Sequence, residues 1–88
     1  MAQFVGQIPE EVDALAVDFD AKAGDIEGLM AALKAKLGST TWAGQDRQRF
    51  EGDWDGQLSA QLRNVAGALR DAATIARGNA DQQRTASS

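Results

Sequence analysis

The residues that could carry chemistry in this 88-residue chain are carboxylates, arginines and hydroxyls. The chain contains no Cys and no His, which removes thiol nucleophiles, imidazole bases and the commonest zinc ligands. The densest acidic group is Glu51, Asp53 and Asp55. Residues two apart on a helix point to different sides, so we interpret this group as a solvated face. We expect no enzymatic activity, no metal site and no cofactor.

Four arginines recur every seven residues, at Arg63, Arg70, Arg77 and Arg84. This spacing places them in one stripe along a helix. Nucleic acid is an unfavourable partner, because 9 Lys and Arg oppose 13 Asp and Glu and give a net charge of −4. We interpret the stripe as a soluble outer face. The alternative is that the stripe meets the acid-rich first helix of a partner.

Turn-forming residues divide the chain into segments at Pro9 and at the cluster Gly38-Ser39-Thr40-Thr41. Pro9 suits the first position of a helix, and Gly38 suits the position just after one. No strand-like alternation occurs, so we predict an all-α fold. The predicted segments are a flexible leader (1–8), a helix (9–37), a turn (38–41), a second helix (42–78) and a flexible C-terminal tail (79–88).

Both predicted helices carry apolar residues at heptad spacing. The second helix departs from this spacing in a run of fours from Phe50 to Leu62, which locally unwinds a left-handed supercoil. Because two helices cannot cover stripes this wide, we expect an antiparallel two-helix hairpin that dimerises into a four-helix bundle. The residues expected at the partner interface are Val12, Leu15, Phe19, Ile26, Leu29, Met30, Leu33, Phe50, Trp54, Leu58, Leu62, Val65 and Leu69.

Two glycines, Gly52 and Gly56, lie four residues apart in the second predicted helix. Glycine weakens a helix by up to about 1 kcal/mol relative to Ala. Either these two are tolerated at exposed positions, or they let another helix approach closely.

The most specific local feature is Trp42-Ala43-Gly44, placed directly after the predicted turn. A Trp at a helix–helix bend can lie over the ends of both helices and become buried. A Gly two residues later leaves space for the indole or for a neighbouring backbone. The pattern is short, but it stands midway along an all-α chain, between two heptad-patterned helices.

With these residues in view, the chain resembles the WXG (ESAT-like) family over roughly residues 8–83. The resemblance includes the actinobacterial-looking run from Trp42 to Trp54. It implies a helical hairpin that dimerises head to tail into a four-helix bundle. It also implies export by a type VII secretion system, driven by a membrane-bound FtsK/SpoIIIE-like ATPase. That route uses no cleavable signal peptide, and we expect none here, because no basic segment followed by an apolar one begins the sequence.

One departure from the family concerns the C-terminal export signal, Tyr-x-x-x-Asp/Glu. This chain has no Tyr. Asp81 could stand at the acidic position, but Arg77 occupies the place of the aromatic residue. Either a partner hairpin supplies the signal, or this chain is recognised differently, or it is not itself exported; we expect the first.

These observations lead to one function and its alternatives. We expect a protein made in the cytoplasm and secreted as a homodimer, or as a heterodimer with a sibling hairpin. The alternative is a cytoplasmic adaptor or targeting chaperone that pairs with a larger secreted toxin or a sibling hairpin. A lytic protein is a third and remote option. A membrane surface is an unfavourable partner, because the polar face of the first helix is acidic.

Overall fold

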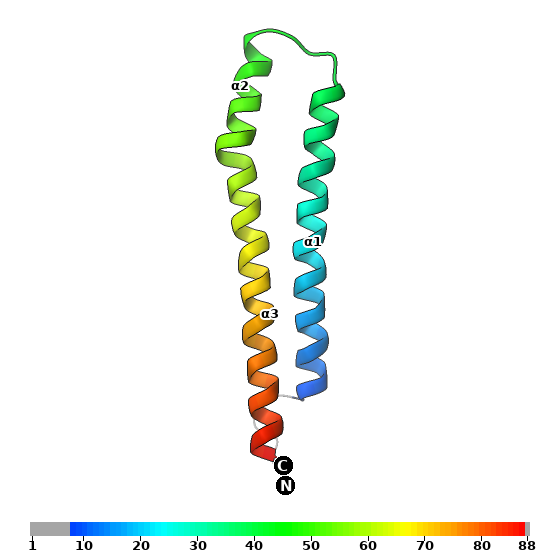
Figure 1. Ribbon diagram of the computed structural model, residues 1–88, viewed down its shortest axis with the longest axis vertical. Helices are drawn as coiled ribbons and strands as arrows, with labels where there is room; N and C mark the ends of the chain where they lie inside the picture. Colours follow the sequence, from blue (N-terminus) through cyan, green and yellow to red (C-terminus); the bar gives the residue numbers. More distant parts are fainter. Residues whose placement is uncertain (1–7, 88) are drawn as a thin grey trace.

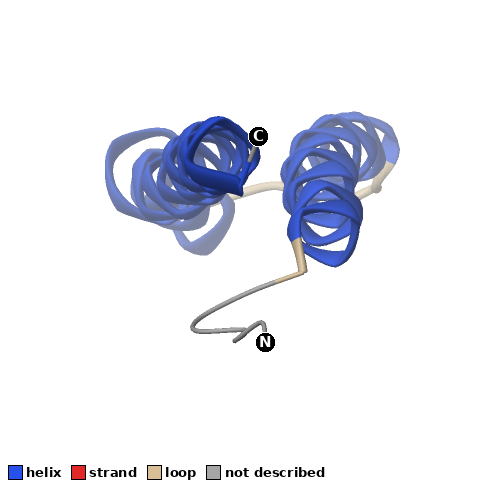
Figure 2. Cartoon of the chain, turned by 90° about the horizontal axis from the view of Figure 1, so that it is seen from below, coloured by secondary structure: helices blue, strands red, loops and turns tan. Residues whose placement is uncertain are grey.

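The computed structural model describes residues 8–87, all of whose regular structure is helical. The elements are α1 (Pro9–Ser39), α2 (Gln45–Asp53), the π-helical turn η1 (Trp54–Leu58) and α3 (Ser59–Ser87). The last three join without a break into one arm, which runs antiparallel to α1 (Figure 1). The molecule measures 68 × 18 × 14 Å and is two helices wide (Figure 2). The predicted all-α class and hairpin are confirmed, and the dimer stays a prediction.

The two ends of α1 are held by local hydrogen bonds. At its start, the Ile8 carbonyl accepts bonds from the N–H groups of Glu11 and Val12 at 3.0 and 3.1 Å, and Pro9 occupies the first helical position as predicted. At its end, the Thr40 hydroxyl donates to the Lys36 carbonyl at 2.6 Å. The helix therefore includes Gly38, which was expected just beyond its end.

The two arms meet along small residues spaced seven apart, which we name the small-residue seam. Ion pairs between Asp13 and Arg84 and between Asp20 and Arg77 fix the antiparallel register of the helices. Small side chains let the two backbones approach closely. The seam consists of Ala16 and Ala23 on α1 and of Ser59, Ala66, Ala73 and Ala80 on α3, each of them buried.

The large apolar residues of α3 lie beside the seam and not in it. Leu58, Leu62, Val65 and Leu69, which were predicted at the partner interface, are exposed or half-buried. The smaller residues face inward because they allow the helices to come closer, and because this rotation brings the arginines of α3 within reach of acids on α1.

Toward the turn the arms separate (Figure 1). The heptad positions of α1 that follow Ala16 and Ala23 are Met30 and Leu37, and these larger side chains hold the helices apart. Trp54, which is only 8% exposed, lies in the widened space. It also begins η1, in which the Ser59 N–H donates to the Trp54 carbonyl five residues back. The wider turn absorbs one extra residue, at the place where the sequence shows its run of fours.

The predicted flexible tail is wrong for residues 79–87, because α3 continues to Ser87. Two contacts with α1 explain the extension: Ala80 is fully buried, and Arg84 pairs with Asp13. The predicted leader, residues 1–8, lies outside the described residues except for Ile8.

The connection between the arms is residues 40–44, so the second arm begins at Gln45 and not at residue 42. Gly44 has φ 109° and ψ −172°, a region that is open essentially to glycine alone. An added Cβ would meet nothing within 4 Å. This glycine is therefore required by its backbone conformation and not by the predicted need for space around the indole.

Substitution of Gly44 tests this assignment. Gly44→Ala should destabilise the hairpin by about 1–3 kcal/mol, because Ala strains the left-handed backbone. Gly52→Ala is the matched control in a helix: a Cβ there meets nothing within 4 Å, so stability should rise by up to about 1 kcal/mol. Urea unfolding measures both, and equal effects of the two substitutions would contradict the assignment.

Candidate functional site

The hairpin has two chemically different faces, on either side of the small-residue seam. On α1, the acids Asp13, Asp20 and Glu27 lie three before or four after a seam residue, whereas Val12, Leu15 and Phe19 lie one or four before one. On α3, arginines lie four after a seam residue, and Leu58, Leu62, Val65 and Leu69 lie one before or three after one. These spacings place these charged residues of both helices on one face and these apolar residues on the other. We name them the ladder face and the apolar face.

The ladder face carries three ion pairs between α1 and α3. Arg70 binds Glu27 through two hydrogen bonds of 2.5 and 2.8 Å, and Arg77 Nη2 lies 2.7 Å from Asp20 Oδ2. Arg84 binds Asp13. The arginine stripe was interpreted as a soluble outer face or as a contact with a partner's first helix. Three of its members instead pair with the first helix of their own chain.

Hydrogen bonding in the ladder shifts three pKa values. The bond from Arg70 lowers the pKa of the Glu27 carboxyl, and the same bond raises the pKa of Arg70. The bond to Asp13 raises the pKa of Arg84. Each side chain in these pairs is 40–51% exposed, so a single pair contributes little to stability. The pairs act mainly by fixing the register and rotation of the helices.

The apolar face gathers nearly all the residues predicted at the partner interface. Among the described residues, no large side chain is fully buried. Leu15, Leu29 and Val65 are 48, 53 and 49% exposed. Leu33, Phe50 and Leu58 are also exposed, Trp54 is buried, and the remaining predicted residues are half-buried: Val12, Phe19, Ile26, Met30, Leu62 and Leu69.

At the turn end, the apolar face opens into a cavity of about 280 Å³, which we name the turn pocket. Trp42 and Phe50 pack together on its wall, with ring centroids 5.8 Å apart and ring planes at 48°. Trp42 is 38% exposed, so its indole does not reach the burial that a Trp at a helix–helix bend can attain. Its aromatic surface is available to a partner. The remaining lining residues are Leu33, Lys36, Leu37, Thr40 and Trp54.

Arg47 organises the loop that carries Trp42, and the sequence reasoning missed it. Its guanidinium donates to three backbone carbonyls: Thr40 and Trp42, each at 2.9 Å, and Leu37 at 3.1 Å. Its Nε donates to Glu51 at 2.9 Å. The Leu37 carbonyl also accepts a bond of 3.3 Å from the Thr40 N–H, so Arg47 adds a second donor at the end of α1. The only sequence signal is a residue with five donors shortly after a glycine turn.

The residues predicted at the export-signal region both lie within α3 and are engaged in ion pairs. Arg77 holds Asp20, and Asp81 accepts a bond of 3.2 Å from Arg84. Neither is part of the turn pocket.

The acidic group near the turn does not converge on one point. Glu51 binds Arg47, and Asp55 lies 3.8 Å from Lys34 Nζ. Within residues 8–87, no three carboxylates are grouped in a way that could hold a metal ion. In the same range, none of the helices has both the length and the hydrophobicity needed to cross a bilayer.

Comparison of the chain with protein-family models, with curated proteins and with solved structures finds no match. The candidate site is therefore defined by its own geometry: an apolar face that ends in an aromatic pocket beside the turn.

The role of Arg47 predicts an asymmetric response to conservative substitution. Arg47→Lys should destabilise the hairpin by about 2 kcal/mol, because an ammonium cannot reproduce the fork of donors that spans three carbonyls. Arg49→Lys, two residues along the same helix, should change stability by less than about 0.5 kcal/mol. Thermal unfolding of the two variants measures the difference, and equal losses would contradict this role.

The lowered pKa of Glu27 predicts a dependence of stability on pH. A carboxyl whose pKa is lower in the folded state, as that of Glu27 is, stabilises the fold above its unfolded pKa, and this contribution is lost as pH falls through the folded pKa. The melting temperature should therefore fall on acidification. Glu27→Gln should make that fall smaller. If the variant shows the same acid slope as the natural chain, Glu27 does not contribute to it.

Proposed function

We propose that this chain is a non-enzymatic hairpin protein of the WXG (ESAT-like) type, which pairs through its apolar face and is handled by a type VII secretion system. The observation that carries the proposal is the apolar face itself. Its large side chains come from both arms, and many are about half exposed. Exposed apolar surface of this extent marks a site of association.

A second hairpin is the partner that best fits the shape of this surface. The face follows a rod 68 Å long and two helices wide. A matching two-helix rod laid on it covers both apolar stripes at once and makes a four-helix bundle. This partner is either a second copy of the chain or a sibling hairpin with a similar face.

The turn pocket provides a recognition feature at one end of such a bundle. Trp42 and Phe50 form an aromatic wall, held in place by the loop bonds of Arg47. We assign this end to recognition by the secretion ATPase, of FtsK/SpoIIIE type, or by another component of the machine. Aromatic side chains with one open face are common anchors in protein interfaces.

A cytoplasmic adaptor is the second candidate function, and one observation favours it. The positions that could correspond to the family's export signal hold Arg77 and Asp81, and both are engaged in ion pairs: Arg77 with Asp20 on α1, and Asp81 with Arg84 on α3. A chain without its own signal either travels with a partner or stays behind after delivering one.

Pairing through the apolar face predicts different effects of the same substitution on the two faces. Leu29→Glu should raise the dissociation constant of the dimer at least about tenfold, because it buries an unpaired carboxylate. Val17→Glu is the matched control: Val17 is 59% exposed on α1 and immediately follows Ala16, toward the ladder side. Its dissociation constant should stay within about twofold. Sedimentation of the chain, alone and mixed with sibling hairpins of its host, measures both, and similar behaviour of the two variants would contradict the interface.

The secretion role is tested separately in the native host. We expect the intact chain in the culture medium of cells with an active secretion ATPase, and its loss from the medium when the ATPase is inactivated. Retention of the chain inside the cell, while a co-expressed partner is exported, would support the adaptor instead. Export that does not depend on the ATPase would contradict both functions.

A further inference from the structure

The ladder face carries a series of ion pairs between α1 and α3, which we name the charge ladder, and one position (rung) of this series holds two positive charges. Each step of seven forward on α1 matches a step of seven back on α3, as the pairs of Asp13 with Arg84 and of Glu27 with Arg70 show. One further step places Lys34 opposite Arg63. Two cations thus lie opposite each other at this position, whereas each of the three preceding positions pairs a carboxylate with an arginine.

The carboxylates near this rung leave Arg63 without a counter-charge. Glu27 is engaged by both terminal nitrogens of Arg70. Asp55 lies 3.8 Å from Lys34 Nζ, and both of these side chains are about two-thirds exposed. Arg63 forms no ion pair within residues 8–87. After these pairings, the positive charge of Arg63 remains unpaired on the ladder face near the turn.

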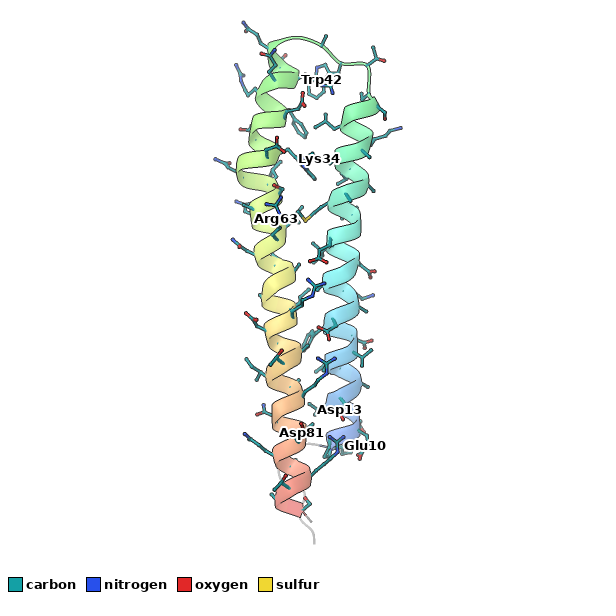
Figure 3. The ribbon with its side chains drawn as sticks, in the orientation of Figure 1. Glu10, Asp13, Lys34, Trp42, Arg63 and Asp81 are labelled. Carbon is teal, nitrogen blue, oxygen red and sulfur yellow. The ribbon has the colours of Figure 1, made fainter. Side chains whose placement is uncertain are left out.

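This charge borders a cavity of about 300 Å³ between the two arms, which we name the rung cavity. Lys34 projects from α1 and Arg63 from the second arm, beside the space where the helices separate (Figure 3). Met30 and the buried Trp54 provide apolar walls, and the Ser59 hydroxyl donates to the Asp55 carbonyl at 3.3 Å. Two carboxylates, Glu27 and Asp55, also line the cavity, and they are paired with Arg70 and Lys34. The cavity thus combines an unneutralised guanidinium with an apolar surface large enough for one side chain.

We propose that the rung cavity binds a carboxylate side chain of an acidic segment in a partner protein, with a neighbouring apolar side chain of that segment against Trp54 and Met30. Arg63 is the principal ligand, because a guanidinium offers a fork of donors that matches a carboxylate. Lys34 adds a second positive charge. The single uncompensated charge and the apolar walls fit a monoanionic group, and the net charge of −4 disfavours more highly charged anions.

This site is independent of pairing through the apolar face. Its charged lining residues lie on the ladder face, which a second hairpin on the apolar face leaves uncovered. The acidic partner is therefore a third component, and its binding does not require the proposed secretion function.

The test is a titration of the full ¹⁵N-labelled chain with the capped peptide acetyl-Ala-Phe-Glu-Ala-amide. The readouts are the NMR signals of the Arg63 side-chain N–H and of the Trp54 indole. We expect saturable shifts of both signals, weakened at least tenfold when Gln replaces Glu in the peptide, and reduced by added salt. Inorganic phosphate is the competing probe and should bind more weakly than the Glu peptide.

Three variants identify the ligand. Arg63→Gln should weaken peptide binding at least tenfold, whereas Arg49→Gln should leave it unchanged. Arg63→Glu should abolish binding while the melting temperature is maintained or raised, because a carboxylate opposite Lys34 completes the ladder. Loss of binding in this variant cannot then be attributed to unfolding.

Three results would overturn the proposal. They are unchanged binding in Arg63→Gln, equal binding of the Glu and Gln peptides, and tighter binding of phosphate than of the Glu peptide. The last would indicate a general anion site. Failure of the chain to dimerise would affect none of these readouts, so the two proposals fail separately.

Discussion

The close contact of α1 and α3 along the small-residue seam is the constraint on which the rest of the structure depends. Ala23 and Ala73 are fully buried although neither has a large side chain. The contact therefore depends on the close approach of the two helices and not on large side chains. Close helices bring Asp20 within reach of Arg77. The same rotation turns the large apolar side chains to the opposite face, where one chain cannot cover them. The seam thus determines which charged residues pair within the hairpin and which apolar side chains remain for a partner to cover.

The size of the seam residues changes along the hairpin, and the turn end follows from that change. Where Met30 and Leu37 replace alanine, the arms diverge (Figure 1), and Trp54 fills the space between them. Trp54 lines both the turn pocket on the apolar face and the rung cavity on the ladder face. One buried indole therefore separates two cavities of different chemistry. The π-helical turn that begins at Trp54 lies in this region, in keeping with the tendency of such turns to occur at functional sites.

The sequence could predict the helices because heptad spacing is a local property, and α1 begins at Pro9 as expected. It could not decide which line of the second helix faces inward. Ala66 and Leu69 are three residues apart, and their spacing does not show which of them faces α1. Contacts between the arms decide this, because the helices approach closely at the line of Ala66 and form ion pairs beside that line. The extension of α3 through Ala80 has the same origin, because its supporting residues lie on α1. The role of Arg47 depended on the path of the loop, which no spacing reveals.

The functional account rests on the claim that a second hairpin covers the apolar face. Small-angle X-ray scattering tests this most directly, because it reports mass and cross-section together. The account predicts a particle of about twice 9.3 kDa whose length stays near 68 Å while its cross-section becomes clearly thicker, once the chain is measured with its partner or at a concentration that favours pairing. A particle of single mass with the 18 × 14 Å cross-section of one hairpin, at every concentration and with every sibling hairpin, would contradict it.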